Sequence, residues 1–133
     1  MPPNFIHLRL HTEFSLVDGI VKIKPLVKRL AELNMPAIAV TDHANLFALV
    51  KFYKAAIGQG IKPVAGADVL LFNPEEPAAP HRLTLLVRND TGYITLMELS
   101  QKPIRKASIK AYLCYGKNGW TLTMTGLLRY LAR

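Results

Sequence analysis

The sequence predicts an α/β fold with a parallel sheet. Three apolar runs, at residues 5–10, 37–40 and 62–71, have the pattern of strands, and the intervals between them contain segments with helical periodicity. Strands that alternate with helices in this way are typical of βαβ units, whose strands pair in parallel. Right-handed crossovers would place the carboxyl ends of all three strands on one side of the sheet.

The first predicted strand alternates between basic and apolar side chains. One face of residues 5–11 carries His7, Arg9 and His11, and the apolar residues lie on the other face. Three basic side chains are therefore expected on the same side of the sheet.

Two helices follow from the 3.6-residue period. In residues 24–33 the apolar side chains recur at helical spacing, and Pro25 stands early in the helix, where its missing N–H costs little. The second helix spans residues 47–56 and closes near Gly58. These helices supply the crossovers between the three strands.

The later elements are a strand and a helix. The strand at residues 62–71 is possible as one piece or as two pieces divided at Gly66, and a proline-rich acidic loop at residues 73–80 separates it from a strand at 82–88. Asn89 then opens a helix that extends to about Leu99.

The last quarter of the chain differs in composition from the rest. Residues 1–100 carry ten Lys and Arg against nine Asp and Glu, whereas residues 101–133 carry seven Lys and Arg and no acid. A basic nucleic-acid-binding module at residues 101–133 is therefore one hypothesis, because basic surfaces attract phosphates. This segment lacks a sustained amphipathic period, although residues 127–132 have the pattern of a short helix.

The composition is otherwise that of one intracellular domain. The chain has 133 residues, half of them apolar, which is enough for a hydrophobic core. No apolar run approaches the roughly 20 residues of a membrane span, and the first residues lack the pattern of a signal peptide. The single cysteine, Cys114, agrees with a reducing compartment. We expect a cytoplasmic protein with no membrane partner.

Candidate metal ligands follow the three strand ends. These are His11, the pair Asp42 and His43, and Asp68. In an α/β barrel such residues converge on one mouth, and imidazole and carboxylate groups bind ions that activate water for phosphate-ester cleavage. The structural alternative is that Asp42 caps the next helix and His43 is a turn residue.

Arg9 counts against an intact metal site. A guanidinium group has no lone pair for a metal, and its charge repels cations. We expect Arg9 to form an ion pair with Asp42 or Asp68, which would hold the barrel mouth together without metal.

Three blocks of sequence carry a family resemblance. Residues 5–19 are FIHLRLHTEFSLVDG, residues 39–47 are AVTDHANLF, and residues 60–68 are GIKPVAGAD. In this order they resemble the N-terminal polymerase-and-histidinol-phosphatase (PHP) domain of bacterial replicative DNA polymerase III alpha subunits, and the resemblance extends to about Leu99. It implies that residues 1–99 form a partial PHP-type distorted (β/α)7 barrel with parallel strands.

The resemblance also implies a set of site residues. Metal-loaded PHP domains hydrolyse phosphoesters, and the matching positions here are His11, Asp18, Asp42, His43 and Asp68. Two positions depart from the family, since Arg9 replaces a histidine ligand and Asp68 replaces a glutamate. We therefore expect a remnant site without catalytic residues and without a required cofactor, and residual binding of Zn, Mn or Mg stays open.

The expected function is that of a fragment of a DNA polymerase subunit in DNA replication. The polymerase site lies in the remainder of the family chain, so the implied role here is structural and docking, without enzymatic activity. The implied partners are the rest of the alpha subunit and the proofreading exonuclease subunit, with DNA contacted only through the parent. The alternative is a small metal-dependent PHP-type phosphoesterase that uses His11, Asp42, His43 and Asp68.

The family pattern stops after Leu99. Our hypothesis is a one-base deletion just after that codon, because restoring one base permits family-like residues from Ser100 onward. Residues 100–133 would then be a basic tail outside the family, translated in the wrong frame. Incomplete barrels expose strand edges and apolar faces, so we also expect poor solubility.

Overall fold

The computed structural model describes residues 5–16, 18–71, 78–79, 81–101, 115–116, 119–120 and 127–131. Most of the basic tail, including Cys114, lies outside the described residues. Most of the residues after Gln101, to which the frameshift hypothesis applies, also lie outside the described residues.

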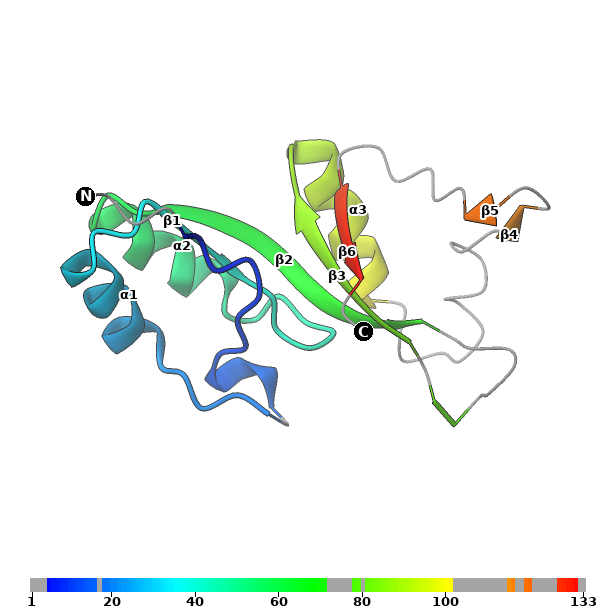
Figure 1. Cartoon of the computed structure of the whole chain (residues 1–133), viewed down its shortest axis with the longest axis horizontal. Helices are drawn as coiled ribbons and strands as arrows, with labels where there is room; N and C mark the ends of the chain where they lie inside the picture. Colours follow the sequence, from blue (N-terminus) through cyan, green and yellow to red (C-terminus); the bar gives the residue numbers. More distant parts are fainter. Residues whose placement is uncertain are drawn as a thin grey trace.

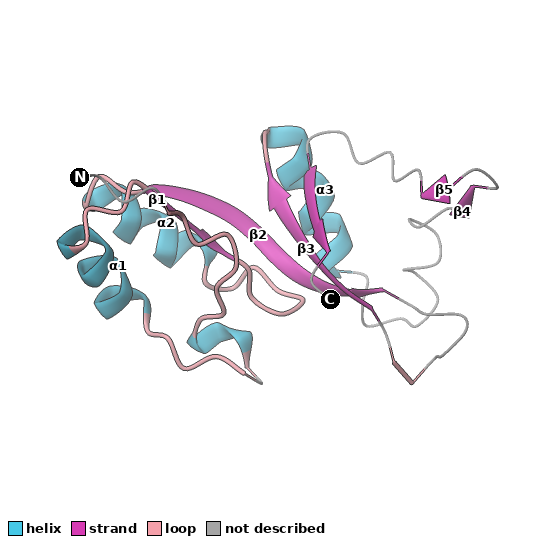
Figure 2. Cartoon of the chain, in the orientation of Figure 1, coloured by secondary structure: helices cyan, strands magenta, loops and turns pink. Residues whose placement is uncertain are grey.

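One long strand joins two groups of elements. Strand β2 (Lys62–Leu71) runs between a group that contains β1 (Ala37–Val40) and a group that contains β3 (His81–Val87), as Figures 1 and 2 show. The sheet has the order β1-β2-β3-β6, with β6 at Leu127–Leu131. The predicted α/β fold is confirmed.

The expectation of parallel strands holds for only part of the sheet. β1 and β2 pair in parallel, whereas β2 pairs with β3, and β3 with β6, in antiparallel fashion. The reason is the length of the connection, because only residues 72–80 separate β2 from β3. A crossover to a parallel neighbour needs about a dozen residues or more, so this connection closes a hairpin.

The predicted strand at residues 5–10 is an extended segment beside β1. It forms one isolated parallel bridge, between His7 and Ile38. The backbone N–H of Ala39 donates to the carbonyl of His7 at 2.8 Å, and the N–H of Thr41 donates to that of Leu10 at 2.8 Å. The Leu10 N–H donates to Thr41 Oγ1 at 2.9 Å. Because a side chain takes this donor, the regular ladder is interrupted.

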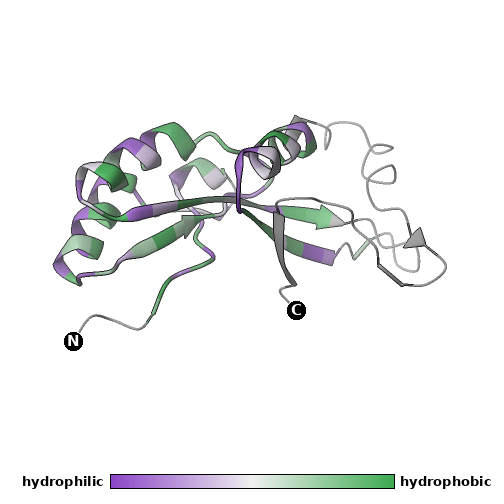
Figure 3. Cartoon of the chain, turned by 90° about the horizontal axis from the view of Figure 1, so that it is seen from above, coloured by the Kyte–Doolittle hydropathy of each residue, from purple (hydrophilic) through white to green (hydrophobic). Residues whose placement is uncertain are grey.

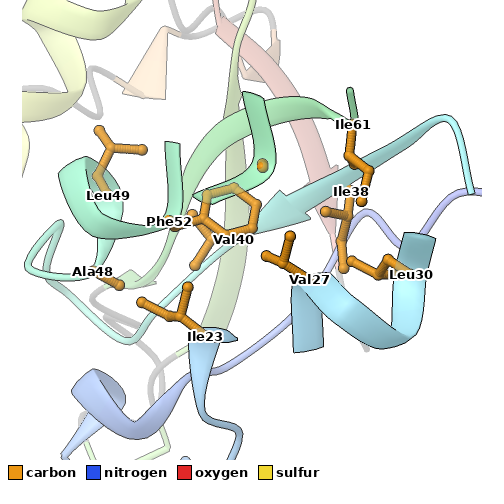
Figure 4. Close-up of a cluster of buried hydrophobic side chains, with 10 residues drawn as sticks. Ile23, Val27, Leu30, Ile38, Val40, Ala48, Leu49, Phe52 and Ile61 are labelled. Carbon is orange, nitrogen blue, oxygen red and sulfur yellow. The ribbon is translucent and has the colours of Figure 1, made fainter. Parts of the chain in front are cut away.

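Two helices pack on one face of the first half of the sheet. α1 (Ile23–Glu32) and α2 (Leu49–Gly58) begin and end within two residues of the predicted bounds. Figure 3 shows both helices on the same side of the sheet as α3 (Asp90–Gln101). Their buried side chains form the main core with β1, shown in Figure 4: Ile23, Val27, Leu30, Ile38, Val40, Ala48, Leu49, Phe52, Ala56 and Ile61.

A second, smaller core lies where α3 covers the hairpin. Its buried members are Ala67, Leu83, Leu85 and Leu96. β2 continues through Gly66 without interruption. Glycine is required at this position because β3 approaches the backbone closely. A Cβ at Gly66 would lie 2.5 Å from the carbonyl oxygen of Leu85.

The tail contributes strands where a helix was expected. Residues 127–131 form β6, which pairs with β3, so the prediction of a short helix there is wrong. The open edge of β3 supplies hydrogen-bond partners that an isolated helix pattern does not reveal. Strands β4 (Tyr115–Gly116) and β5 (Gly119–Trp120) pair as a small hairpin. None of the helices described is both long and apolar enough for a membrane span.

Candidate functional site

The candidate site lies where the extended N-terminal segment, the end of β1 and the middle of β2 meet. The short helix η1 (Glu13–Ser15) follows the N-terminal segment, and its N-cap Thr12 accepts a hydrogen bond from the Phe14 N–H. An isolated bridge joins His43, just beyond β1, to Asp68 of β2. The backbone therefore brings all three predicted strand ends together.

Asp68 is the centre of the site. Its carboxylate is buried, with a side chain 2% exposed. Oδ2 accepts from Arg9 Nε at 2.7 Å and lies 2.7 Å from His11 Nε2. Oδ1 accepts a hydrogen bond from the Thr84 hydroxyl of β3. The predicted ion pair of Arg9 is confirmed, with Asp68 as the partner.

His11 bridges two carboxylates. Its Nε2 faces Asp68, and its Nδ1 lies 2.8 Å from Asp18 Oδ2. An ionised carboxylate only accepts hydrogen bonds, so the imidazolium form, with a proton on each nitrogen, satisfies both contacts. His11 thus links the loop after η1 to the sheet.

Asp18 is held by the loop that carries it. Ser15 Oγ donates to Asp18 Oδ1 at 2.8 Å, and the backbone N–H of His43 donates to Ser15 Oγ at 3.0 Å. The hydrogen bond from Ser15 is the main cause that lowers the pKa of Asp18, and the contact with His11 adds to it. The network therefore extends from β2 to the end of β1.

Asp42 has a different role from the predicted helix cap. Its Oδ1 accepts from the Thr12 N–H at 2.6 Å, and its Oδ2 accepts from Thr12 Oγ1 at 2.8 Å, with Asp42 only 2% exposed. Helix α2 has Ala48 as its N-cap, without a side-chain hydrogen bond. The capping interpretation of Asp42 is wrong, because this carboxylate fixes the N-terminal segment instead.

Opposing effects act on the pKa of Asp68. Burial is the largest and raises the pKa, since a carboxylate is less stable away from water. Hydrogen bonds from Thr84, Arg9 and His11, together with the charge of Arg9, outweigh burial and leave the pKa lowered. The anionic form is thus the one that the folded site favours.

Sequence reasoning missed three residues of the network. Thr12 and Ser15 hold Asp42 and Asp18, and Thr84 reaches Asp68 from β3. Thr84 lies opposite Asp68 in the antiparallel register. Only the hairpin, which was not expected, places it there.

As arranged, the residues present do not fit a divalent metal. Both oxygens of Asp68 and both ring nitrogens of His11 are occupied by protein partners, and Arg9 brings a fixed positive charge. Of the five candidates, the structure joins His11, Asp18 and Asp68 through their side chains and leaves those of Asp42 and His43 out. Among the described residues no three His, Cys, Asp or Glu side chains are placed so that they could hold a metal ion.

Comparisons with known proteins agree on one family. The PHP domain pattern matches residues 7–126. DNA polymerase III subunit alpha of Pseudomonas aeruginosa is 59% identical over 99 residues, which is 74% of this chain and 8% of that protein. The subunit of Escherichia coli is 47% identical over 107 residues, which is 78% of this chain and 9% of its own length.

A solved structure shares the fold. An amidohydrolase from Chromobacterium violaceum, described with bound sulfate and no metal, superimposes with a TM-score of 0.54 over 70% of this chain and 32% of its own. At 21% identity this likeness concerns the fold alone. The match of the family pattern to most of the sequence shows that the chain belongs to the PHP domain family.

Proposed function

We propose that this chain is the N-terminal portion of a bacterial replicative DNA polymerase alpha subunit, in which it is a structural and docking domain. The chain spans 8% of the length of the Pseudomonas aeruginosa subunit that it matches, so polymerisation would belong to the remainder. The rest of the subunit and the proofreading exonuclease subunit are the proposed partners. A cytoplasmic location follows from that role.

The observation that carries this proposal is the ion pair of Arg9 with Asp68. It occupies the centre of a site where hydrolytic relatives would need open ligands, and its Nε–Oδ2 distance is 2.7 Å. Together with His11 and Thr84 it joins the N-terminal segment to β2 and β3. A site of this kind stabilises the fold, with both oxygens of Asp68 already in hydrogen bonds to the protein.

A chimaera tests the polymerase assignment. The 99 matched residues of the Pseudomonas aeruginosa subunit would be replaced by the aligned segment of this chain, and primer extension and complementation would be measured. We expect a functional subunit. The unmodified host subunit is the control for expression and activity. A chimaera that is soluble and folded yet inactive would overturn the proposal.

The second candidate function is a metal-dependent phosphoesterase. It is favoured by the shared fold with the amidohydrolase and by the imidazole and the two carboxylates that meet at His11, Asp18 and Asp68. Hydrolysis of bis(p-nitrophenyl) phosphate would be measured with Zn, Mn or Mg added to the full chain. We expect no rate above that of the His11→Ala variant. Stoichiometric metal and a rate that this variant abolishes would establish the phosphoesterase instead.

A further inference from the structure

The outer edge of β3 is occupied by a strand from beyond the family match. β6 begins at Leu127, one residue after the last position that the PHP pattern matches. It pairs with β3 in antiparallel fashion, from Leu83 with Leu131 to Val87 with Leu127, and Figure 1 shows β6 (red) alongside β3. An edge of the family's sheet is therefore completed by residues that lie outside the family pattern.

β3 has the burial of an inner strand. Four consecutive residues of β3, from Leu83 to Leu86, are at most 5% exposed. Such a run is typical of a strand that is covered on both faces. β2 pairs with one side of β3, and only β6 pairs with the other among the described residues. Without β6 the backbone donors and acceptors of this side would be unpaired, and an unpaired edge accepts an added strand.

The same edge adjoins the candidate site. Thr84 of β3 pairs with Tyr130 of β6, and its hydroxyl donates to the buried carboxylate of Asp68. A strand on the outer edge therefore holds in place the segment that presents Thr84 to Asp68. The occupant of this edge matters to the site as well as to the sheet.

A longer polypeptide supplies a second occupant for this edge. The chain spans 8% of the Pseudomonas aeruginosa subunit that it matches, and the family resemblance ends near Leu99, close to the end of α3. α3 packs on β3 through Leu96 in the smaller core. The polypeptide that follows α3 in such a subunit therefore starts beside β3. One edge accepts one strand at a time, so β6 excludes any strand of that polypeptide.

We infer that β6 is a self-cap, meaning that residues 127–131 close the edge of β3 at which a strand of the remaining alpha subunit would add. The cap has to leave before the two polypeptides can join. This inference rests on the proposed function, and it assigns the outer edge of β3 as the junction with the rest of the subunit.

A labelled peptide with the sequence of residues 125–133 tests the cap on the full chain. In an antiparallel pair alternate residues donate to the neighbouring strand, so the double variant Leu128→Pro and Arg129→Pro removes at least one of these hydrogen bonds from β6. Fluorescence anisotropy should show that the peptide binds this variant at least about tenfold more tightly than the unmodified chain, in which the tethered β6 competes at a high effective concentration.

Ala132→Pro is the matched control, because it places a proline one residue beyond β6. It should bind the peptide as weakly as the unmodified chain. Equal binding to all three chains would overturn the inference. So would a double variant that keeps the circular dichroism of the unmodified chain and does not bind the peptide.

A second measurement does not require the isolated double variant to fold. All 133 residues of this chain, in place of the aligned segment alone, would be joined to the same remainder of the Pseudomonas aeruginosa subunit. Primer extension should fall about fivefold or more relative to the shorter chimaera, because β6 leaves the edge free in only a fraction of the molecules. Leu128→Pro with Arg129→Pro should restore the rate, and Ala132→Pro should not. Equal rates of the two chimaeras, or no rescue by the two prolines, would overturn the inference.

Failure of the cap is distinguishable from failure of the proposed function. An active short chimaera, with neither peptide binding nor rescue by the prolines, would remove the self-cap alone. A short chimaera that is folded but inactive would remove the polymerase role whatever the peptide does.

Discussion

At the scale of single residues, one buried carboxylate organises the site. Asp68 is buried, and its carboxylate contacts three side chains from two segments of the chain: Arg9 and His11 of the N-terminal segment and Thr84 of β3. The sequence indicated that Arg9 pairs with an aspartate, because a guanidinium in this position needs an anion. It did not decide between Asp42 and Asp68, since that choice depends on which carboxylate lies on the same face of the sheet as Arg9.

Asp68→Asn should destabilise the fold by about 3 kcal/mol, because it removes the charge of a buried carboxylate and leaves Arg9 without its ion-pair partner. The lower end of the usual range applies, since the Arg9 side chain is 39% exposed. Urea unfolding followed by circular dichroism measures the change. Glu32→Gln, which breaks the exposed pair of Glu32 with Arg29, is the control and should change stability by less than about 1 kcal/mol. Equal effects of both variants would contradict the central role of Asp68.

Stability should fall in acid because of the same carboxylate. The pKa of Asp68 is lowered in the folded state, against the effect of burial, by the hydrogen bonds from Thr84, Arg9 and His11. The unfolded chain therefore binds a proton more readily, so this stability is fully present above the ordinary aspartate pKa of 3.8 and is lost as pH falls from there through the folded pKa. Asp18 acts in the same direction but is 41% exposed, so solvent screens its contribution.

Unfolding in urea at a series of pH values between about 5 and 2 tests this dependence. Asp68→Asn should flatten the curve of stability against pH below the ordinary aspartate pKa of 3.8. If the variant keeps the slope of the parent chain, the acid sensitivity arises from other carboxyl groups.

At the scale of elements, local patterns predicted the helices and the central strands well. The periodicity of α1 and α2 and the apolar runs of β1 and β2 depend on neighbours close in sequence. The antiparallel hairpin and β6 depend on pairing between distant residues, which no local period encodes. Thr84 was missed for this reason, because its contact with Asp68 exists only in the observed register.

Gly66→Ala tests the close contact between β2 and β3. The added Cβ would lie 2.5 Å from the Leu85 carbonyl oxygen and 2.8 Å from Leu86, so the strands must separate. We expect a loss of about 1–3 kcal/mol in the free energy of unfolding, typical of overpacking.

Gly58→Ala is the matched control at the end of α2. A Cβ there meets nothing within 4 Å, and alanine restricts the unfolded chain, so stability should rise by about 0.4–1 kcal/mol. Thermal and urea unfolding of the two variants measure both effects. A Gly66→Ala variant as stable as the parent would show that the hairpin has room to relax.

At the scale of the whole molecule, the end of the sheet depends on the tail. β6 covers the outer edge of β3 over five paired positions, from Leu83 with Leu131 to Val87 with Leu127. The boundary proposed at Leu99 separates this strand from the rest, whereas the PHP pattern extends to residue 126. The nucleotide sequence after the Leu99 codon tests the frameshift hypothesis, since codons incompatible with family residues in the shifted frame would reject it.

Removal of residues 102–133 should promote self-association, whatever frame encodes them. The truncated chain would expose the backbone donors and acceptors of β3, and an unpaired strand edge is a template for pairing with another chain. The measurement is light scattering as a function of concentration. A chain that lacks only residues 132–133 keeps β6 and serves as the control. If the chain without residues 102–133 stays monomeric and melts cooperatively, then α3 and the two cores suffice to protect the sheet, and β6 has no part in its solubility.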